Sequence, residues 1–217
     1  AHQPEVLNRW LDEKAFVFAN VPYRIKSLEA IFDNPKSTII FDSDLSAKLR
    51  IRAKEKGSDS ALLRSTDESI HKANLTEKIL IPLLVKLSNF VPGGGVWMNT
   101  ERPEWNDANN ALVGNGLSMV TAGHLLRYVR FCRDWWSQLD HDKQLSLSAP
   151  VADFIDSLIA IFSNKNTDPH ASPADGILRT QVVRALGLSG QCYREHVYAG
   201  NFETQRKLTL KTVLQLL

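Results

Sequence analysis

The sequence predicts a mainly helical protein with one small β insertion. Apolar residues recur at helical spacing in several long segments, and two short strand-like runs lie near residues 35–56. No repeat of fixed period is present, which argues against a solenoid. The 217 residues are enough for one large domain with its own core. We therefore expect a single mainly helical domain over residues 1–217, with the β-containing insertion at 32–66.

The N-terminal half supplies the first helix and the insertion. Residues 4–21 have apolar side chains near helical spacing, and Pro22 follows, so a helix is expected there. In the insertion, "STIIF" (37–41) and "KLRIR" (48–52) look like strands on either side of the turn-rich "DSDLSA". The basic stretch 48–57 is interrupted by Glu55. We interpret it as a solvated strand or hairpin arm rather than a nucleic-acid patch.

The C-terminal half predicts a succession of helices. Asn74 followed by Glu77 resembles a capping box, and Pro82 should kink or delimit the helix that it opens. A long helix is expected over 112–139, with apolar residues on more than one face and therefore burial on several sides. The segment 151–162 has a clean amphipathic stripe.

Two further helices complete the prediction. One should begin at Ser172-Pro173 and run to about Leu186, with Gly187 as its stop. The last, over 201–217, ends in an apolar Leu-Leu without a stop signal. We therefore expect the chain to be an excerpt of a larger protein, or its C-terminal helix to pack on a partner.

Composition excludes several classes of protein. The net charge of +2 is close to neutral, unlike that of a typical nucleic-acid binder, and no apolar run reaches the ~18 residues of a membrane span. Cys132 and Cys192 have no zinc-type spacing and are expected to be two buried free thiols, although a single bridge is also compatible with the sequence. No metal or cofactor is expected. The compartment stays open between cytoplasm and periplasm.

The most informative stretch is "RPEWNDANNALVG", from Arg102 to Gly114, which follows the "PGGG" turn at 92–95. Cleavage of a glycosidic bond needs one carboxylic acid to protonate the leaving oxygen, and a second group to activate water, attack directly, or yield to phosphate. Sugar sites also use aromatic platforms and amides that bind hydroxyl groups. This stretch offers all of these residue types, namely Glu104 and Asp107 as carboxylates, Trp105 as a platform, and Asn106, Asn109 and Asn110 as amides.

The spacing of the two carboxylates supports a catalytic interpretation. Glu104 and Asp107 are three residues apart and would share one face of a helical turn, where double ionisation is disfavoured. A purely structural interpretation competes with it. Asn106 or Asp107 would then cap the following helix, and Trp105 would be a core residue. Residue types alone favour this structural interpretation.

The stretch resembles the catalytic loop of the helical-toroid glycoside hydrolases and phosphorylases, the (α/α) six-hairpin class. Its cellobiose phosphorylase branch has a "DWNDGMN" pattern after a glycine-containing turn, and "EWNDANN" is the counterpart here. The resemblance covers about 25 residues, and its central "WND-x-x-N" is the specific part. It implies that Asp107 is the general acid. Glu104 stands where the family has Asp, Ala108 where it has Gly, and Asn109 where it has Met.

The same resemblance implies a second group, which the sequence does not place. Hydrolases of this class use a base carboxylate from a later helix, whereas phosphorylases bind phosphate with cationic partners. The best local candidate is "YREHVYAGN" (193–201), which clusters Arg194, Glu195, His196 and Tyr198. An ordinary helix-to-loop transition is the favoured interpretation of that stretch. A complete toroid has twelve helices, and about half that number are expected here, as helical hairpins forming part of a toroid.

The sequence thus predicts a carbohydrate-active enzyme, or a fragment of one, that cleaves glycosidic bonds by hydrolysis or phosphorolysis. Asp107 would be the general acid and Glu104 an auxiliary carboxylate. The expected partners are an oligosaccharide and, for phosphorolysis, phosphate. The alternative is a non-catalytic helical protein–protein interaction module. The expected substrate-binding residues are Trp97, Arg102, Trp105, Asn106, Asn109 and Asn110.

Overall fold

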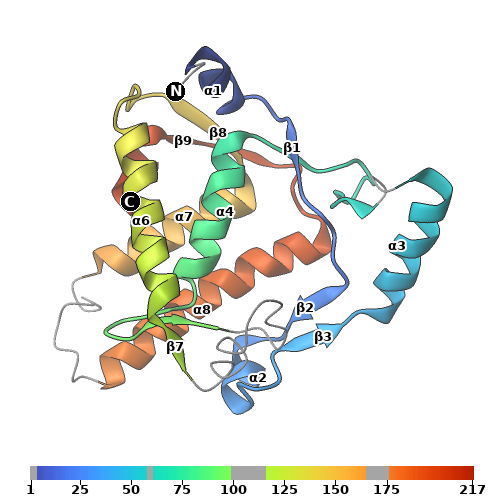
Figure 1. Ribbon diagram of the computed structural model, residues 1–217, viewed down its shortest axis with the longest axis horizontal. Coiled ribbons are helices and arrows are strands. Elements are labelled where there is room, and N and C mark those ends of the chain that lie inside the picture. The colour runs from blue at the N-terminus through green and yellow to red at the C-terminus, as the bar shows by residue number, and fades with distance from the viewer. Residues whose placement is uncertain (1–3, 58–60, 99–115, 165–175) are drawn as a thin grey trace.

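The computed structural model describes residues 4–57, 61–98, 116–164 and 176–217. Over these residues helices predominate and small antiparallel sheets of two or three strands join them (Figure 1). The helices are α1 (Pro4–Trp10), α2 (Leu28–Asp33), α3 (Ser43–Lys56), α4 (Leu75–Leu87), α6 (Met119–Trp136), α7 (Ala149–Ser163), α8 (Gly176–Ala199) and α9 (Leu210–Leu216). The strands are β1 (Phe16–Val17), β2 (Tyr23–Ile25), β3 (Ile39–Phe41), β4 (Lys72–Ala73), β5 (Phe90–Val91), β6 (Gly95–Trp97), β7 (Leu117–Ser118), β8 (Gln144–Ser148) and β9 (Gln205–Thr209).

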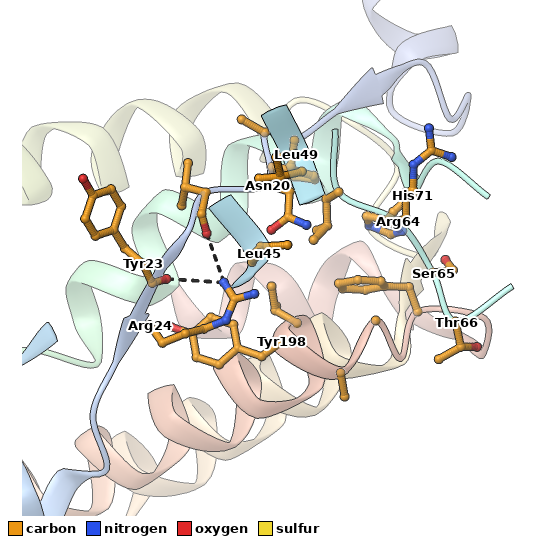
Figure 2. A pocket seen from close by; sticks show the side chains of 18 of the residues that line it. Asn20, Tyr23, Arg24, Leu45, Leu49, Arg64, Ser65, Thr66, His71 and Tyr198 are labelled. Carbon is orange, nitrogen blue, oxygen red and sulfur yellow. Dashed lines mark hydrogen bonds between the residues drawn. The ribbon is translucent and has the colours of Figure 1, made fainter. Parts of the chain in front are cut away.

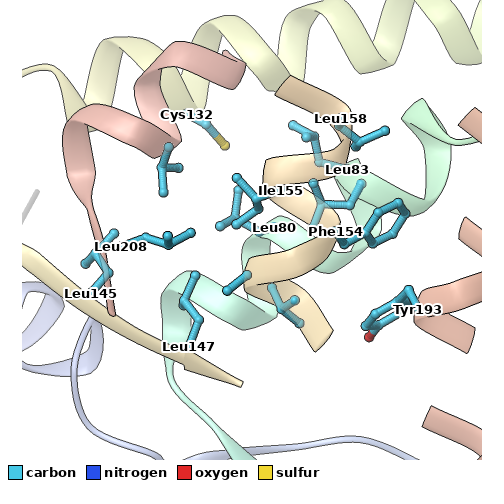
Figure 3. Packing of buried hydrophobic residues seen from close by; sticks show 14 of the residues in the cluster. Leu80, Leu83, Cys132, Leu145, Leu147, Phe154, Ile155, Leu158, Tyr193 and Leu208 are labelled. Carbon is cyan, nitrogen blue, oxygen red and sulfur yellow. The ribbon is translucent and has the colours of Figure 1, made fainter. Parts of the chain in front are cut away.

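The hydrophobic core is built around α7. Its stripe packs against α4, α8, α9 and the sheet of β8 and β9 (Figure 3). Ile155 and Leu158 of α7 are fully buried, as are Leu80 and Leu84 of α4. Burying such side chains stabilises the fold by roughly 1.5–3 kcal/mol each. The amphipathic helix predicted at 151–162 is therefore confirmed.

The strands β8 and β9 form a two-stranded sheet that packs against α7 at one side of this core. They pair antiparallel from Gln144↔Thr209 to Ser148↔Gln205. Helix α7 begins directly after β8, and α9 begins directly after β9. Leu210 and Val213 of α9 are buried in the core cluster, so the apolar face of this helix packs on the rest of the chain.

The insertion predicted at 32–66 is partly wrong. "STIIF" does contain a strand, β3, which pairs with β2. "KLRIR" lies instead inside the helix α3. Asp42 caps this helix by accepting a hydrogen bond from the Leu45 N–H at 2.9 Å, and basic residues occupy its last turn. Lysine and arginine are good helix formers, and these terminal signals outweigh the short apolar alternation.

The two end segments also differ from the prediction. Helix α1 stops at Trp10, and Phe16 and Val17 pair with β4 as the strand β1. The segment 201–217 begins with the strand β9 and becomes helical only at Leu210. In both places pairing with a distant strand overrides the local helical pattern. The hydrogen bonds and cross-strand contacts of that pairing come from residues far away in the sequence, which the local pattern does not include.

Helix ends and faces give further corrections. Helix α8 does not stop at Gly187 but continues to Ala199. The glycine serves packing instead, because a Cβ at this position would lie 2.7 Å from the Leu28 Cδ1. Helix α4 continues through Pro82 instead of ending there. Helix α6 begins at Met119 and buries only Cys132 and Trp136, so the prediction of burial on several sides is wrong.

The described residues include both cysteines and the long helices that could be compared with a membrane span. Both cysteines are free, as expected, but only Cys132 is buried, whereas Cys192 is exposed. No described helix combines the length and apolarity required to cross a bilayer.

Candidate functional site

Most of the predicted catalytic stretch lies outside the described residues. This applies to Arg102, Glu104, Trp105, Asn106, Asp107, Asn109 and Asn110. Of the predicted site residues, Trp97 is described, at the end of strand β6.

The strands next to this stretch form a three-stranded sheet, β5–β6–β7. Trp97 pairs with Leu117, so the residues that flank the predicted catalytic stretch on its two sides lie on neighbouring strands. The "PGGG" sequence makes the turn between β5 and β6, with Gly93 and Gly95 at positive φ. A Cβ on Gly94 would lie 2.3 Å from the Leu117 side chain. The tight turn is confirmed, and the close approach that it permits is to strand β7.

A small cavity of about 260 Å³ lies beside Trp97. Its walls come from α2, β5, β6 and α8, and they are largely apolar. The polar lining groups include Ser88, Asn89 and Arg194. The structure thus brings together Trp97 and Arg194, two residues that sequence reasoning took from separate stretches. A cavity just below the ~300–1,000 Å³ range of ligand pockets suits one ring-sized group.

Arg194 is a half-buried cation in this cavity. Burial lowers the pKa of its guanidinium, and the neighbouring Tyr198 and Glu195 oppose that change. Because arginine stays protonated in proteins, the lowered pKa marks a poorly hydrated positive charge that would gain from an anionic or hydroxyl-rich ligand. The backbone of residues 193–201 is the helix-to-loop transition that was favoured for this stretch. Helix α8 ends at Ala199, and Gly200 follows with a φ of 75°.

A larger cleft of about 720 Å³ lies at the C-terminal end of α8 (Figure 2). It is bordered by residues 18–25, by Ile39, by helix α3, by the segment 63–71, by Ile81 and by the last turns of α8 with Gly200 and Phe202. Its lining includes four basic residues and several aromatic residues. The sequence analysis missed this cleft, because its walls come from several segments far apart in the chain.

A buried polar cluster adjoins the cleft at His71. Glu77 accepts hydrogen bonds from the Ser148 N–H at 2.9 Å and from the Ser148 hydroxyl at 2.7 Å. Its Oε1 lies 3.5 Å from His71 Nε2, and the His71 ring stacks on Phe202 at 4.0 Å. The expected capping box is half confirmed: the Asn74 side chain accepts from the Glu77 N–H at 2.9 Å, but the Glu77 carboxylate binds Ser148.

Over the described residues no three histidine, cysteine or acidic side chains are grouped as metal ligands would be. A scan against protein-family models and a search of curated proteins both return no match to this chain.

Proposed function

We propose that this chain belongs to a carbohydrate-active enzyme that cleaves glycosidic bonds by general-acid catalysis. In this proposal Asp107 protonates the leaving oxygen, and Glu104 is an auxiliary carboxylate. The scaffold would be part of a helical toroid. In support of that scaffold, the successive helices α7 and α8 pack against each other, as the members of a helical hairpin do.

The observation that carries the proposal is the cavity shared by Trp97 and Arg194. It borders strand β6, from which the chain proceeds toward the "EWNDANN" sequence. An indole face supplies apolar contact area for a sugar ring, and a guanidinium binds hydroxyl or phosphate oxygens through several donors. Both partners that a sugar site needs therefore line one cavity, which borders the strand that precedes the motif in the sequence.

The first experiment replaces Asp107. Glucose disaccharides of each linkage would be incubated with the protein, with and without inorganic phosphate, and released sugar and sugar phosphate measured. Asp107→Asn should lower turnover by ~10²–10⁴-fold, because the proton donor is lost. Asp134→Asn, an exposed change on α6, is the matched control and should leave turnover unchanged. Near-normal turnover of Asp107→Asn on every cleaved substrate would contradict the proposal.

A second variant separates the two reaction types. If phosphate is the nucleophile and Arg194 binds it, Arg194→Gln should raise the phosphate concentration needed for half-maximal rate more than the sugar concentration. For a hydrolase, the same variant should weaken sugar binding alone. Circular dichroism of both variants would verify that the helices are intact.

One observation favours the alternative, a non-catalytic interaction module. Helix α6 exposes Met119, Val120 and Phe131, each more than half accessible. Exposed apolar groups gathered on one element are typical of interaction sites. A thermal-shift screen with oligosaccharides discriminates the two functions, because a sugar at 100 times its Kd stabilises by ~2.7 kcal/mol. A screen without any shift would favour the interaction module.

A further inference from the structure

We propose that the 720 Å³ cleft bordered by α3 and the end of α8 is a binding site for a small phosphorylated molecule, a phosphate monoester with an organic ring. This inference goes beyond the proposed glycosidic cleavage, because the cleft lies apart from the cavity at Trp97 and shares no lining residue with it.

The charge of the lining is the first support. Arg24, Lys48, Arg52 and Arg64 border the cleft, whereas Glu68 is the acidic residue among the described lining groups. The whole chain carries a net charge of only +2, so positive charge is concentrated here. Low-dielectric walls around such a set of cations strengthen their attraction for an anion.

The acidic groups near the cleft leave this excess in place. Glu68 pairs with Arg52 at 2.6 Å. Asp42 forms an ion pair with Arg24, with its carboxylate 3.9 Å from Nε. Glu203 is hydrogen-bonded to the Thr66 hydroxyl. Among the described residues, Lys48 and Arg64 have no acidic side chain paired with them, so both keep positive charge available for a ligand.

Arg24 is held ready for an anion (Figure 2). Its Nη1 donates to the carbonyl oxygens of Val21 at 3.0 Å and Tyr23 at 3.4 Å, and its guanidinium lies 4.5 Å from the centre of the Tyr198 ring. The Tyr198 hydroxyl is itself fixed, since it accepts a hydrogen bond from the Ile25 N–H at 3.0 Å. A guanidinium that is oriented before binding loses little conformational entropy when it engages phosphate.

Arg64 has an unused donor. Its Nη1 donates to the Glu68 carbonyl oxygen at 2.5 Å, whereas its buried Nε has no hydrogen-bond partner among the described residues. Arg64 borders the cleft, and its delocalised guanidinium brings positive charge to that wall. A phosphate oxygen is the strongest acceptor for such a group.

The size and aromatic lining indicate that the ligand is more than a free anion. A volume of about 720 Å³ lies inside the range of pockets for small organic molecules. Tyr198 places an aromatic ring beside Arg24 in this lining, and Phe202 lines the cleft as a largely buried ring. The walls of the cleft converge from several segments, a shape that suits one compact molecule rather than the extended backbone of a nucleic acid.

Isothermal titration calorimetry at constant ionic strength tests the proposal, with phenyl phosphate as the probe and phenol and inorganic phosphate as partial probes. Phenyl phosphate should bind, inorganic phosphate should bind more weakly, and phenol should not bind. Arg64→Gln should weaken phenyl phosphate binding at least ~10-fold, and Lys48→Gln at least ~3-fold. Each substitution removes a charge-assisted contact.

Arg50→Gln is the matched control, because Arg50 is exposed on the same helix as Lys48 and does not line the cleft. Its affinity should stay within twofold of the parent. Lys48 is also exposed, so Lys48→Gln cannot fail merely through misfolding. Absence of phenyl phosphate binding, or equal weakening by Arg50→Gln and the two cleft variants, would overturn the proposal. Equal affinity for inorganic phosphate and phenyl phosphate would overturn the assignment to an organic ester.

Discussion

His71 Nε2 lies 3.5 Å from Glu77 Oε1, and both side chains are almost completely buried. The carboxylate is held by two hydrogen bonds from Ser148, so β8 and the start of α4 are joined by a polar contact inside the core. The histidine is held between Phe18 and Phe202. One cluster therefore links the central core to the wall of the basic cleft.

Glu77→Gln should destabilise the fold by about 1–3 kcal/mol, because the two charge-assisted hydrogen bonds from Ser148 to the carboxylate would be replaced by weaker bonds to a neutral amide. Urea unfolding followed by circular dichroism measures this change. Glu55→Gln, an exposed substitution on α3, is the control and should change the free energy of unfolding by less than about 0.5 kcal/mol. Equal stabilities for the two variants would show that the Ser148 contacts contribute nothing.

Two helical glycines should respond oppositely to alanine. Gly123→Ala on α6 should stabilise by roughly 0.5–1 kcal/mol, since nothing lies within 4 Å of the added Cβ and alanine favours the helix. Gly190→Ala on α8 should destabilise, because its Cβ would lie 2.8 Å from the Ser88 Cβ. Thermal unfolding of both variants provides the measurement. A rise in Tm for Gly190→Ala would contradict the packing of α8 against Ser88.

The two thiols should differ in reactivity. Cys132 is buried, and burial raises the pKa of its thiol to about 11, with an opposing contribution from Tyr128. Cys192 is exposed. An aromatic disulfide reagent at pH 8 should therefore label one thiol rapidly in the folded protein and two in denaturant. Cys192→Ser should abolish the rapid reaction, whereas rapid labelling that persists in this variant would place Cys132 at the surface.

Stability should fall at alkaline pH. Burial raises the pKa of Tyr128 to about 12, and that of Cys132 to about 11, from ordinary values of 10.0 and 9.0. The folded state thus keeps protons that the unfolded state releases. This contribution is fully present below pH 9 and is lost as the pH rises through 11 to 12.

Urea unfolding at several pH values between 8 and 11 tests this expectation. The free energy of unfolding should decline with a smaller slope in Tyr128→Phe, which lacks the titrating hydroxyl group. The Tyr128 hydroxyl donates to the Ile79 carbonyl oxygen at 3.0 Å, so this variant should also lose some stability at neutral pH. An unchanged alkaline slope in Tyr128→Phe would rule out this tyrosine as a source of the decline.

Local signals in the sequence were sufficient for the central helices. The Asn74 cap and the stripe beginning at Val151 placed α4 and α7, because both helices bury one clean face in the core. The sequence was less informative where distant segments pair. Phe16 and Val17 have helical neighbours along the chain, yet they join Ala73 and Lys72 in a sheet. No local pattern encodes that partner.

The candidate sites show the same limit. Trp97 was identified from its place before the "EWNDANN" sequence, and Arg194 from its aromatic surroundings, but their common cavity depends on α2 and α8 packing around β5 and β6. The basic cleft depends on residues as far apart as Arg24 and Tyr198. Asp107 and Glu104 lie outside the described residues, so their predicted roles stay predictions.

The pairing of β8 with β9 has a consequence for synthesis of the chain on the ribosome. Leu145 and Leu147 of β8 are buried only once β9 and α9 are available to join the same cluster. Residues emerge at about 5–20 per second, so β8 spends several seconds as an edge strand without its partner. During that interval the nascent protein exposes an unpaired strand with two apolar side chains, and a chaperone that binds short alternating apolar strands would protect it there.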